Sequence, residues 1–223
     1  MPTLNDRLAA MRETAARNLK PEVAQLLERH IDELRSPNAT NHPLKAGDAA
    51  PAFILKDLDG NRVSSADLIA RGPLVVSFYR GTWCPFCNEE LKALNDSYES
   101  FRRLGASLVA ITPQSAAFAA AYRTEHEIAF PLLVDPNAGV AERFGLAYSF
   151  PAYLSELYRN VFRHDLARIN ASGTWRLPIP ARYVIDRSGT IVDAEVNADY
   201  RYRPDPEATL PVVAALTSSA SSV

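Results

Sequence analysis

The two cysteines of the chain, Cys84 and Cys87, stand three positions apart in a Cys-Pro-Phe-Cys sequence and are its only thiols. Two thiols at this spacing can cycle between a dithiol and a disulfide, because one thiolate attacks an oxidant or a disulfide and the other completes the exchange. The pair follows an apolar, β-branched run and precedes residues with helical periodicity. Its position therefore favours redox chemistry.

The flanking segments predict how the dithiol is held. Residues 73–79 read as a buried strand, and apolar residues at spacings of three and four predict an amphipathic helix from 85 to about 104. With Pro85 as the first helical residue, Cys84 is the N-cap and Cys87 the third helical position. A Cys84 thiolate would then accept a hydrogen bond from the Cys87 N–H at the positive end of the helix dipole. We expect Cys84 to attack and Cys87 to resolve.

Three other uses of the pair fit its position less well. Burial of two unrelated thiols does not explain a Cys-x-x-Cys at a strand-to-helix junction. A disulfide closing so short a loop stabilises little. A zinc site needs further ligands, and the four histidines form no second paired motif: His30, His42, His126 and His164. Neither a metal nor an organic cofactor is expected.

Composition limits the class of protein. A chain of 223 residues suits one α/β domain with an extension. With 24 basic and 26 acidic side chains it is nearly neutral, so binding to nucleic acid or to an anionic membrane surface is not indicated. No apolar stretch approaches the roughly 20 residues that span a bilayer. The first 18 residues lack the apolar core of a secretory signal. We therefore expect a cytoplasmic protein, and in that reducing compartment an isolated cysteine pair is more often catalytic than structural.

The chain divides into three parts. Residues 1–43 predict an N-terminal helical extension, broken at Pro21, and a linker; residues 44–216 a domain; and residues 217–223 a flexible tail. We expect the amphipathic extension to pack on its own domain, the alternative being a docking arm or a homodimer interface. The expected strands are 52–55, 62–63, 74–79, 107–111, 132–135, 183–186 and 190–196, and the expected helices beyond the dithiol helix are 115–127, 139–144 and 207–216. This order predicts an α/β fold with a central mixed sheet flanked by helices.

Several motifs resemble those of a known family. Residues 47–53 (Gly-Asp-Ala-Ala-Pro-Ala-Phe), the strand leading into Phe78-Tyr79, residues 133–137 (Leu-Val-Asp-Pro-Asn) and residues 183–189 (Tyr-Val-Ile-Asp-Arg-Ser-Gly) occur in the order found in peroxiredoxin-like proteins. The chain from 44 to 216 thus resembles the thioredoxin-like fold of the alkyl hydroperoxide reductase and thiol-specific antioxidant (AhpC/TSA) superfamily. The resemblance implies a thiol-dependent peroxidase that reduces hydroperoxides and is recycled by thioredoxin, glutaredoxin or glutathione.

The chain departs from that family at the reactive loop. In the peroxiredoxin pattern Pro-x-x-x-Thr/Ser-x-x-Cys, Cys87 falls at the peroxidatic cysteine and Cys84 at the threonine. Pro180 falls where the family's arginine is expected, in a segment similar to the cis-proline loop of thioredoxins. Arg182 is the candidate substitute for the missing guanidinium, the alternative being an exposed arginine at a strand end.

The dithiol itself resembles a different group. Cys-Pro-Phe-Cys is similar to the glutaredoxin Cys-Pro-Tyr-Cys, and Trp83 matches the tryptophan before the thioredoxin dithiol. Ser77 replaces the buried aspartate of thioredoxins, and Glu89 and Glu90 are expected to be solvated residues of the first helical turn. The residues expected to form the substrate groove beside the two cysteines are Thr82, Trp83, Pro180 and Arg182.

An aromatic-rich segment, residues 147–177, is inserted before the proline loop. It is expected either to wall the site and select a bulky substrate or simply to pack on the core. Three functions follow from the whole pattern. A peroxidase, in which either Cys84 or Cys87 attacks the hydroperoxide, ranks first. A thiol–disulfide oxidoreductase acting on disulfides through Cys84 ranks second, and a non-catalytic redox sensor is the third.

Overall fold

The computed structural model describes residues 2–36, 39–40 and 42–218. Its centre is a seven-stranded sheet with the order β2-β1-β5-β4-β3-β8-β9. Strand β3 (Leu74–Phe78) pairs in parallel with β4 (Ser107–Thr112) and antiparallel with β8 (Ala181–Ile185). Every residue of β3 is buried. The loop that carries the dithiol therefore leaves a fully buried strand in the interior of the sheet.

The remaining strands complete a mixed sheet. They are β1 (Ile54–Asp57), β2 (Arg62–Ser64), β5 (Leu132–Val134) and β9 (Ile191–Val196), while β6 (Ala147–Ser149) and β7 (Arg176–Pro178) form a separate two-stranded sheet. Strands β1–β2 and β8–β9 are antiparallel hairpins, whereas β4 and β5 pair in parallel. The predicted fold class is confirmed.

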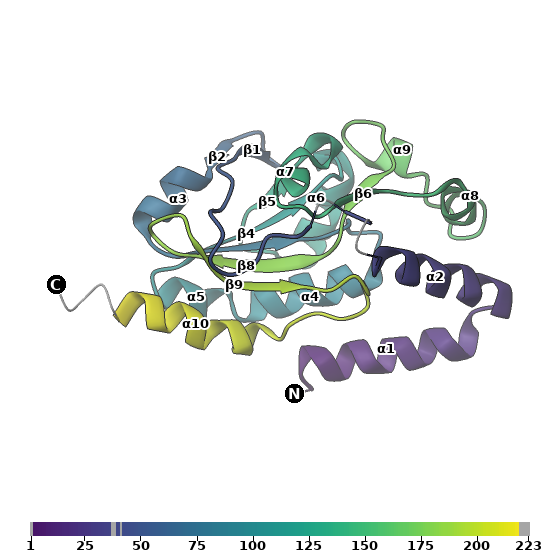
Figure 1. The fold of residues 1–223 in the computed structure, drawn as a ribbon, viewed down its shortest axis with the longest axis horizontal. Coiled ribbons are helices and arrows are strands. Elements are labelled where there is room, and N and C mark those ends of the chain that lie inside the picture. Colours follow the sequence, from purple (N-terminus) through teal and green to yellow (C-terminus); the bar gives the residue numbers. More distant parts are fainter. Residues whose placement is uncertain (1, 37–38, 41, 219–223) are drawn as a thin grey trace.

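Helices cover both faces of the sheet (Figure 1). They are α3 (Ser65–Arg71), α4 (Pro85–Asp96), α5 (Tyr98–Arg103), α6 (Ala116–Glu125), α7 (Gly139–Arg143), α8 (Ala152–Asn160), α9 (Leu166–Ile169) and α10 (Pro206–Ser218), with a 3-10 turn, η1 (Pro136–Ala138). Alternate residues of β3 serve two cores, because successive side chains of a strand point to opposite faces. Val76 and Phe78 join one apolar cluster, while Val75 and Tyr79 join the other, which contains both cysteines and α4.

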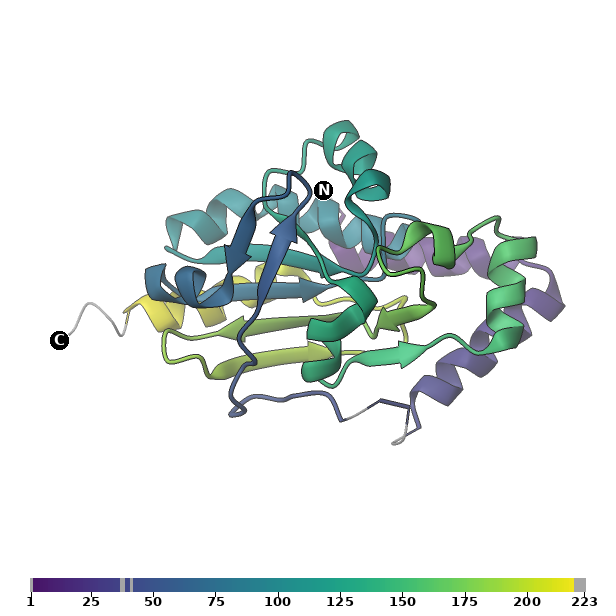
Figure 2. The same ribbon diagram turned by 90° about the horizontal axis from the view of Figure 1, so that it is seen from above.

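The N-terminal helices α1 (Leu4–Asn18) and α2 (Pro21–Leu34) pack on the domain, as expected. Helix α1 contacts α4 and buries Leu4 and Leu8, and α2 contacts α8. Figure 2 shows the α1–α2 pair running along the end of the sheet beside α8 and the loops around it. The extension and the inserted segment, which are far apart in sequence, therefore meet at the end of the molecule that carries the dithiol.

Some element boundaries differ from the prediction. The expected helix from 85 to 104 is two helices, α4 and α5, and Ser97 separates them as the C-cap of the first and the N-cap of the second. Helix α10 extends to Ser218, so the first two residues of the predicted tail are helical. Residues 219–223 of that tail and residues 37, 38 and 41 of the predicted linker lie outside the described residues. Within the described part of the chain, no helix is long and apolar enough to cross a membrane.

Candidate active site

Cys84 is the N-cap of α4, with extended backbone angles, and Pro85 is the first helical residue, as the sequence predicts. The Cys84 N–H donates to the Gly81 carbonyl at 3.1 Å, which closes the loop between β3 and α4. Gly81 has a φ of 149°, and a Cβ there would clash with the Trp83 ring and the Gln114 amide. Only glycine fits this turn, so the local sequence fixes where the Cys84 sulfur stands.

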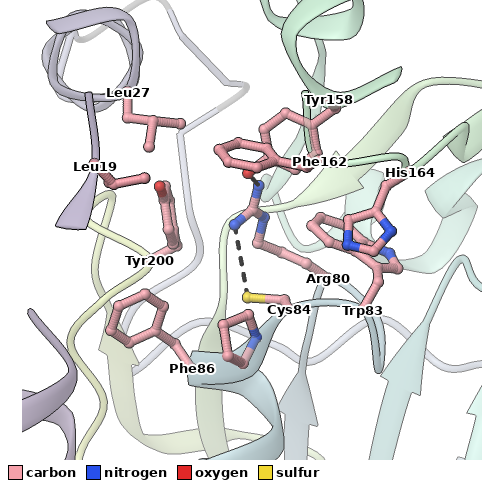
Figure 3. Close-up of a pocket in the computed structure, with 11 residues that line it drawn as sticks. Leu19, Leu27, Arg80, Trp83, Cys84, Phe86, Tyr158, Phe162, His164 and Tyr200 are labelled. Atoms are coloured by element: carbon pink, nitrogen blue, oxygen red, sulfur yellow. Dashed lines mark hydrogen bonds between the residues drawn. The ribbon is translucent and has the colours of Figure 1, made fainter. Parts of the chain in front are cut away.

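Arg80 lies beside the Cys84 sulfur. Its Nη1 donates to Cys84 Sγ at 3.7 Å (Figure 3). Burial alone would raise the pKa of Cys84, but a hydrogen bond from the Cys87 thiol and the positive charges of Arg80 and Arg203 outweigh it, so the pKa lies below its ordinary value. The Cys87 N–H adds a small effect in the same direction, although its geometry falls short of a side-chain cap. The structure thus favours a Cys84 thiolate.

The surroundings of Arg80 explain why this thiolate is stable. The guanidinium is 1% exposed; its Nη2 donates to the Tyr158 hydroxyl at 2.9 Å, and its carbon lies 4.1 Å from the Tyr200 ring centre and 4.8 Å from that of Trp83. No ion pair joins it to an Asp or Glu of the described residues. A buried cation is costly unless an anion accompanies it. The Cys84 thiolate is the anion in place to do so.

Cys87 has the opposite character. It is fully buried one turn into α4, and burial together with the Cys84 sulfur raises its pKa above the ordinary value. Arg203 Nη2 donates to its sulfur at 3.4 Å, and the positive charge of Arg203 offsets part of that rise. Cys87 is therefore the protonated partner that hydrogen-bonds to the Cys84 thiolate. This order of acidity is the one expected from the sequence.

A buried ionic cluster lies beneath the dithiol and corrects two expectations. Glu90 is 1% exposed rather than solvated, and its carboxylate accepts hydrogen bonds from Arg182 Nη2 at 2.8 Å and Arg203 Nε at 2.6 Å. Arg182 is also 1% exposed, not an exposed arginine at a strand end. Glu90 is buried because it stands three residues after Cys87, on the same inward face of α4. Small Ser77 pairs with Arg182 across β3 and β8 and donates to Glu90 at 3.4 Å.

Of the four residues expected to form the substrate groove, only Trp83 lines the pocket over Cys84. Thr82 instead bonds to the Gln114 side chain, its N–H donating at 2.6 Å, and lines a neighbouring groove that Trp83 shares. Arg182 is held under the site by Glu90.

Pro180 lies in a separate pocket with Asn5 and Arg203, away from the pocket over Cys84. Among residues 2–36, 39–40 and 42–218 no peptide bond is cis, so the expected cis-proline loop is wrong. The physical reason is that residues 179 and 180 link β7 directly to β8. The Ile179 N–H donates to the Leu146 carbonyl at 2.9 Å, which ties this short link to the residue before β6.

The pocket over Cys84 has a volume of about 310 Å³ and is built from three distant parts of the chain (Figure 3). The N-terminal helices supply Leu19 and Leu27, the inserted segment supplies Tyr158 and Phe162, and Tyr200 comes from the chain after β9. The inserted segment therefore walls the site as well as packing on the core.

Sequence reasoning missed the two arginines that contact the sulfurs. The sequence could have indicated Arg80, because it is a charged residue directly after an apolar strand and only four positions before Cys84. Arg203 stands 116 positions from Cys87, and no local spacing marks it. The same holds for Leu19 and Leu27, which look like ordinary apolar positions of surface helices.

A thioredoxin-like sheet with a thiolate at the start of its central helix, held against a buried guanidinium, defines a thiol-based redox protein. The comparison with protein families agrees. The model of the AhpC/TSA family matches residues 46–194, and the chain belongs to this family.

Individual relatives are peroxiredoxins by name. A protein of Mycobacterium tuberculosis, provisionally named a peroxiredoxin, is 32% identical over 154 residues, which are 69% of this chain and 86% of the relative. The chloroplastic peroxiredoxin Q of Oryza sativa subsp. japonica is 36% identical over 100 residues, 45% of this chain and 46% of the relative. The crystal structure of peroxidoxin BcpB from Mycobacterium tuberculosis superposes with a TM-score of 0.61 at 22% identity, over 78% of this chain and 99% of that one.

Alkylation of the reduced protein should modify Cys84 before Cys87. The lowered pKa of Cys84 keeps it a thiolate at neutral pH, and its sulfur adjoins the pocket, whereas the raised pKa of Cys87 keeps that thiol protonated. The rate at Cys84 should stay constant as the pH falls through neutral and drop only in acid. Peptide mapping after limited iodoacetamide treatment measures this order, and dominant labelling of Cys87 would contradict it.

Proposed function

We propose that this protein is a thiol-dependent peroxidase in which Cys84 attacks the hydroperoxide and Cys87 resolves the oxidised sulfur. The observation that carries the proposal is the Cys84 sulfur 3.7 Å from the Arg80 guanidinium at the edge of a pocket. A thiolate is the form that attacks a peroxide, and the guanidinium can stabilise negative charge as it develops on the breaking O–O bond. Membership of the AhpC/TSA family supports the same reaction.

The residues present can carry a balanced reaction. The Cys84 thiolate attacks the outer oxygen of the hydroperoxide, so that an S–O bond forms and the O–O bond breaks. The leaving alkoxide takes the proton of the Cys87 thiol and departs as the alcohol, or as water when the substrate is hydrogen peroxide. The Cys87 thiolate then attacks the Cys84 sulfenic acid and expels hydroxide, leaving a disulfide. One hydroperoxide is reduced and two thiols are oxidised.

An external thiol must reduce the disulfide to close the cycle. We propose that the protein is cytoplasmic and that thioredoxin, glutaredoxin or glutathione supplies this thiol. Reduction begins when a thiolate attacks one sulfur of the disulfide. Cys84 adjoins the pocket, whereas Cys87 lies beneath it against Arg203. The Cys84 sulfur is therefore the one that an incoming thiol would reach.

Single-cysteine variants test the peroxidase. Cys84→Ser should consume no peroxide above the background rate, because the nucleophile is lost. Cys87→Ser should consume one equivalent and stop at a sulfenic acid, because nothing resolves it. Rapid mixing with peroxide measures the rate, and dimedone trapping with mass spectrometry locates the sulfenic acid. The reverse pattern would assign the attack to Cys87, at the position of the peroxidatic cysteine in the family pattern.

A thiol–disulfide oxidoreductase is the second candidate, because an N-cap cysteine of lowered pKa three residues before a buried thiol also suits disulfide exchange. The position of Pro180 in a different pocket weighs against it, since this proline does not line the pocket over Cys84, where it would have to bind an extended disulfide substrate. Insulin reduction separates the two functions. Insulin turnover with negligible peroxide consumption would favour the oxidoreductase.

A further inference from the structure

We propose that Tyr158 is a catalytic residue of the peroxide reaction. Its hydroxyl, held by Arg80, donates a hydrogen bond to the oxygen that leaves when the Cys84 sulfur breaks the O–O bond. The proposal rests on the peroxidase function and adds a residue to it. It follows from the position of this hydroxyl, from its unused hydrogen, and from the direction in which the leaving oxygen moves.

Arg80 links the hydroxyl to the sulfur. Its Nη1 donates to Cys84 Sγ at 3.7 Å, and its Nη2 donates to the Tyr158 oxygen at 2.9 Å. Figure 3 shows the guanidinium between the two side chains, which both line the pocket. Because a guanidinium is planar and rigid, it fixes where the phenol stands relative to the attacking sulfur.

The hydrogen of the phenol is available to a substrate. The Tyr158 oxygen accepts a hydrogen bond from Arg80, and within the described part of the chain its O–H donates to no other atom. A tyrosine hydroxyl can accept and donate at the same time. Burial raises the pKa of Tyr158 more than the charge of Arg80 lowers it, so the hydroxyl keeps its hydrogen while the thiolate reacts. The side chain is 5% exposed, and a donor sheltered from water stabilises charge most strongly.

The reaction brings the leaving oxygen toward this hydroxyl. The thiolate attacks the outer oxygen along the O–O bond, so the inner oxygen departs on the side away from the sulfur. Tyr158 lies on the far side of the guanidinium from Cys84 (Figure 3). Negative charge develops on the inner oxygen only as the bond breaks, so the hydrogen bond is stronger in the transition state than with intact peroxide. Tyr158 keeps its proton, and the proton that completes the product still comes from Cys87.

Three other donors on or beside the pocket are less suitably placed. The Thr82 hydroxyl is bonded to the Gln114 side chain and lines the neighbouring groove. The His164 ring packs against Trp83, with 6.0 Å between the ring centres. The Tyr200 hydroxyl points toward the N-terminal helices, away from the sulfur (Figure 3). The phenol bonded to the guanidinium is therefore the donor best placed for the leaving oxygen.

Tyr158→Phe tests the hydroxyl, because it keeps the ring that packs edge-on against Trp83, Phe150 and Phe162. Oxidation of the reduced variant by hydrogen peroxide should be slower by at least about tenfold. Peracetic acid is the comparison oxidant. It releases acetate, whose acid has a pKa of roughly 4, whereas hydrogen peroxide releases hydroxide, whose acid has a pKa of about 15.7. The better leaving group needs no donor, so this rate should stay within about threefold of the wild type.

The matched control is Tyr153→Phe, which removes a hydroxyl from the same helix, α8. The Tyr153 hydroxyl donates to Glu33 at 2.6 Å, and its side chain lines none of the pockets described above. This variant should change neither rate. The ultraviolet absorbance of the Cys84 thiolate should titrate at nearly the same pH in Tyr158→Phe as in the wild type, since the positive charges around the sulfur remain.

The outcomes separate this role from others. A retained peracetic acid rate shows that Tyr158→Phe is folded with its nucleophile intact. An unchanged hydrogen peroxide rate, or equal losses with both oxidants and an unchanged circular dichroism spectrum, would overturn the proposal. A raised pKa of Cys84, with a loss that disappears at alkaline pH, would also overturn it, because Tyr158 would then only position Arg80. Absence of hydrogen peroxide turnover in the wild type would instead refute the peroxidase function.

Discussion

Arg80→Met should slow peroxide reduction at neutral pH by roughly a hundredfold. Arg80 is among the charges that hold the pKa of Cys84 below its ordinary value against the effect of burial. Without it the pKa of Cys84 should rise toward its ordinary value, because burial is then opposed only by the Cys87 hydrogen bonds and Arg203, and less thiolate is present at neutral pH. The guanidinium that stabilises the breaking O–O bond is lost at the same time. Met keeps the length of the side chain and removes a cation that is buried at 1% exposure.

The pH dependence distinguishes this explanation from a loss of structure. In the wild type the thiolate persists as the pH falls through neutral, so the rate should be constant there and decline only in acid. In Arg80→Met the rate should increase steadily from neutral to alkaline pH, and at high pH it should recover the part of the loss that is due to protonation. Stopped-flow rates and the ultraviolet absorbance of the thiolate measure both effects.

Two variants control for the loss of a positive charge. Arg80→Lys keeps a cation near the sulfur and should keep the acidic pH profile, with a smaller loss of rate. Arg163→Met removes an exposed arginine from the neighbouring groove and should leave the profile as in the wild type. An unchanged profile in Arg80→Met would show that another group ionises Cys84.

The sequence predicts the placement of Cys84 well because that placement is local. The β-branched run defines a strand, Pro85 fixes the first helical residue, and Gly81 permits the turn between them. These features lie within about a dozen residues of each other, and each has its own physical signature. The order of strands and helices likewise predicts the mixed sheet, since it depends on patterns inside each segment.

The charged environment of the dithiol is not local, and the sequence does not reveal it. Glu90 looks solvated because it follows Glu89 near the start of a helix, and only the pairing of β3 with β8 brings Arg182 under it. Arg203 reaches Cys87 from the chain after β9. Pro180 resembles a thioredoxin proline in sequence, but it lies in another pocket, with Asn5 and Arg203. Long-range pairing decided each of these cases.

Glu90→Gln should reduce the free energy of unfolding by about 3–5 kcal/mol, the loss expected when one partner of a buried ion pair is removed. Glu90, Arg182 and Arg203 are each 5% exposed or less, and the carboxylate accepts hydrogen bonds from both guanidiniums. The amide keeps the shape of the side chain but leaves two buried cations without an anion. Urea denaturation of the reduced protein, followed by circular dichroism, measures the change.

The adjacent glutamate is the matched control. Glu89 is 20% exposed and pairs with Arg7 at 3.0 Å and with Lys92 at 3.1 Å. Surface pairs of this kind contribute about 1 kcal/mol or less, so Glu89→Gln should be nearly as stable as the wild type. Equal losses in the two variants would contradict the cluster, because both substitutions remove one carboxylate from α4.

The same substitution should change the balance between the two thiols. Arg203 already lowers the pKa of Cys87 against the effects of burial and of the Cys84 sulfur, and Glu90 neutralises part of its charge. Without the carboxylate the full charge of Arg203 acts on Cys87. Cys87 should therefore be alkylated faster in Glu90→Gln than in the wild type, under conditions where both proteins are folded. Glu90 would then be a positioning residue that keeps Cys87 protonated and leaves the attack to Cys84. Destabilisation with unchanged Cys87 labelling would limit its role to stability.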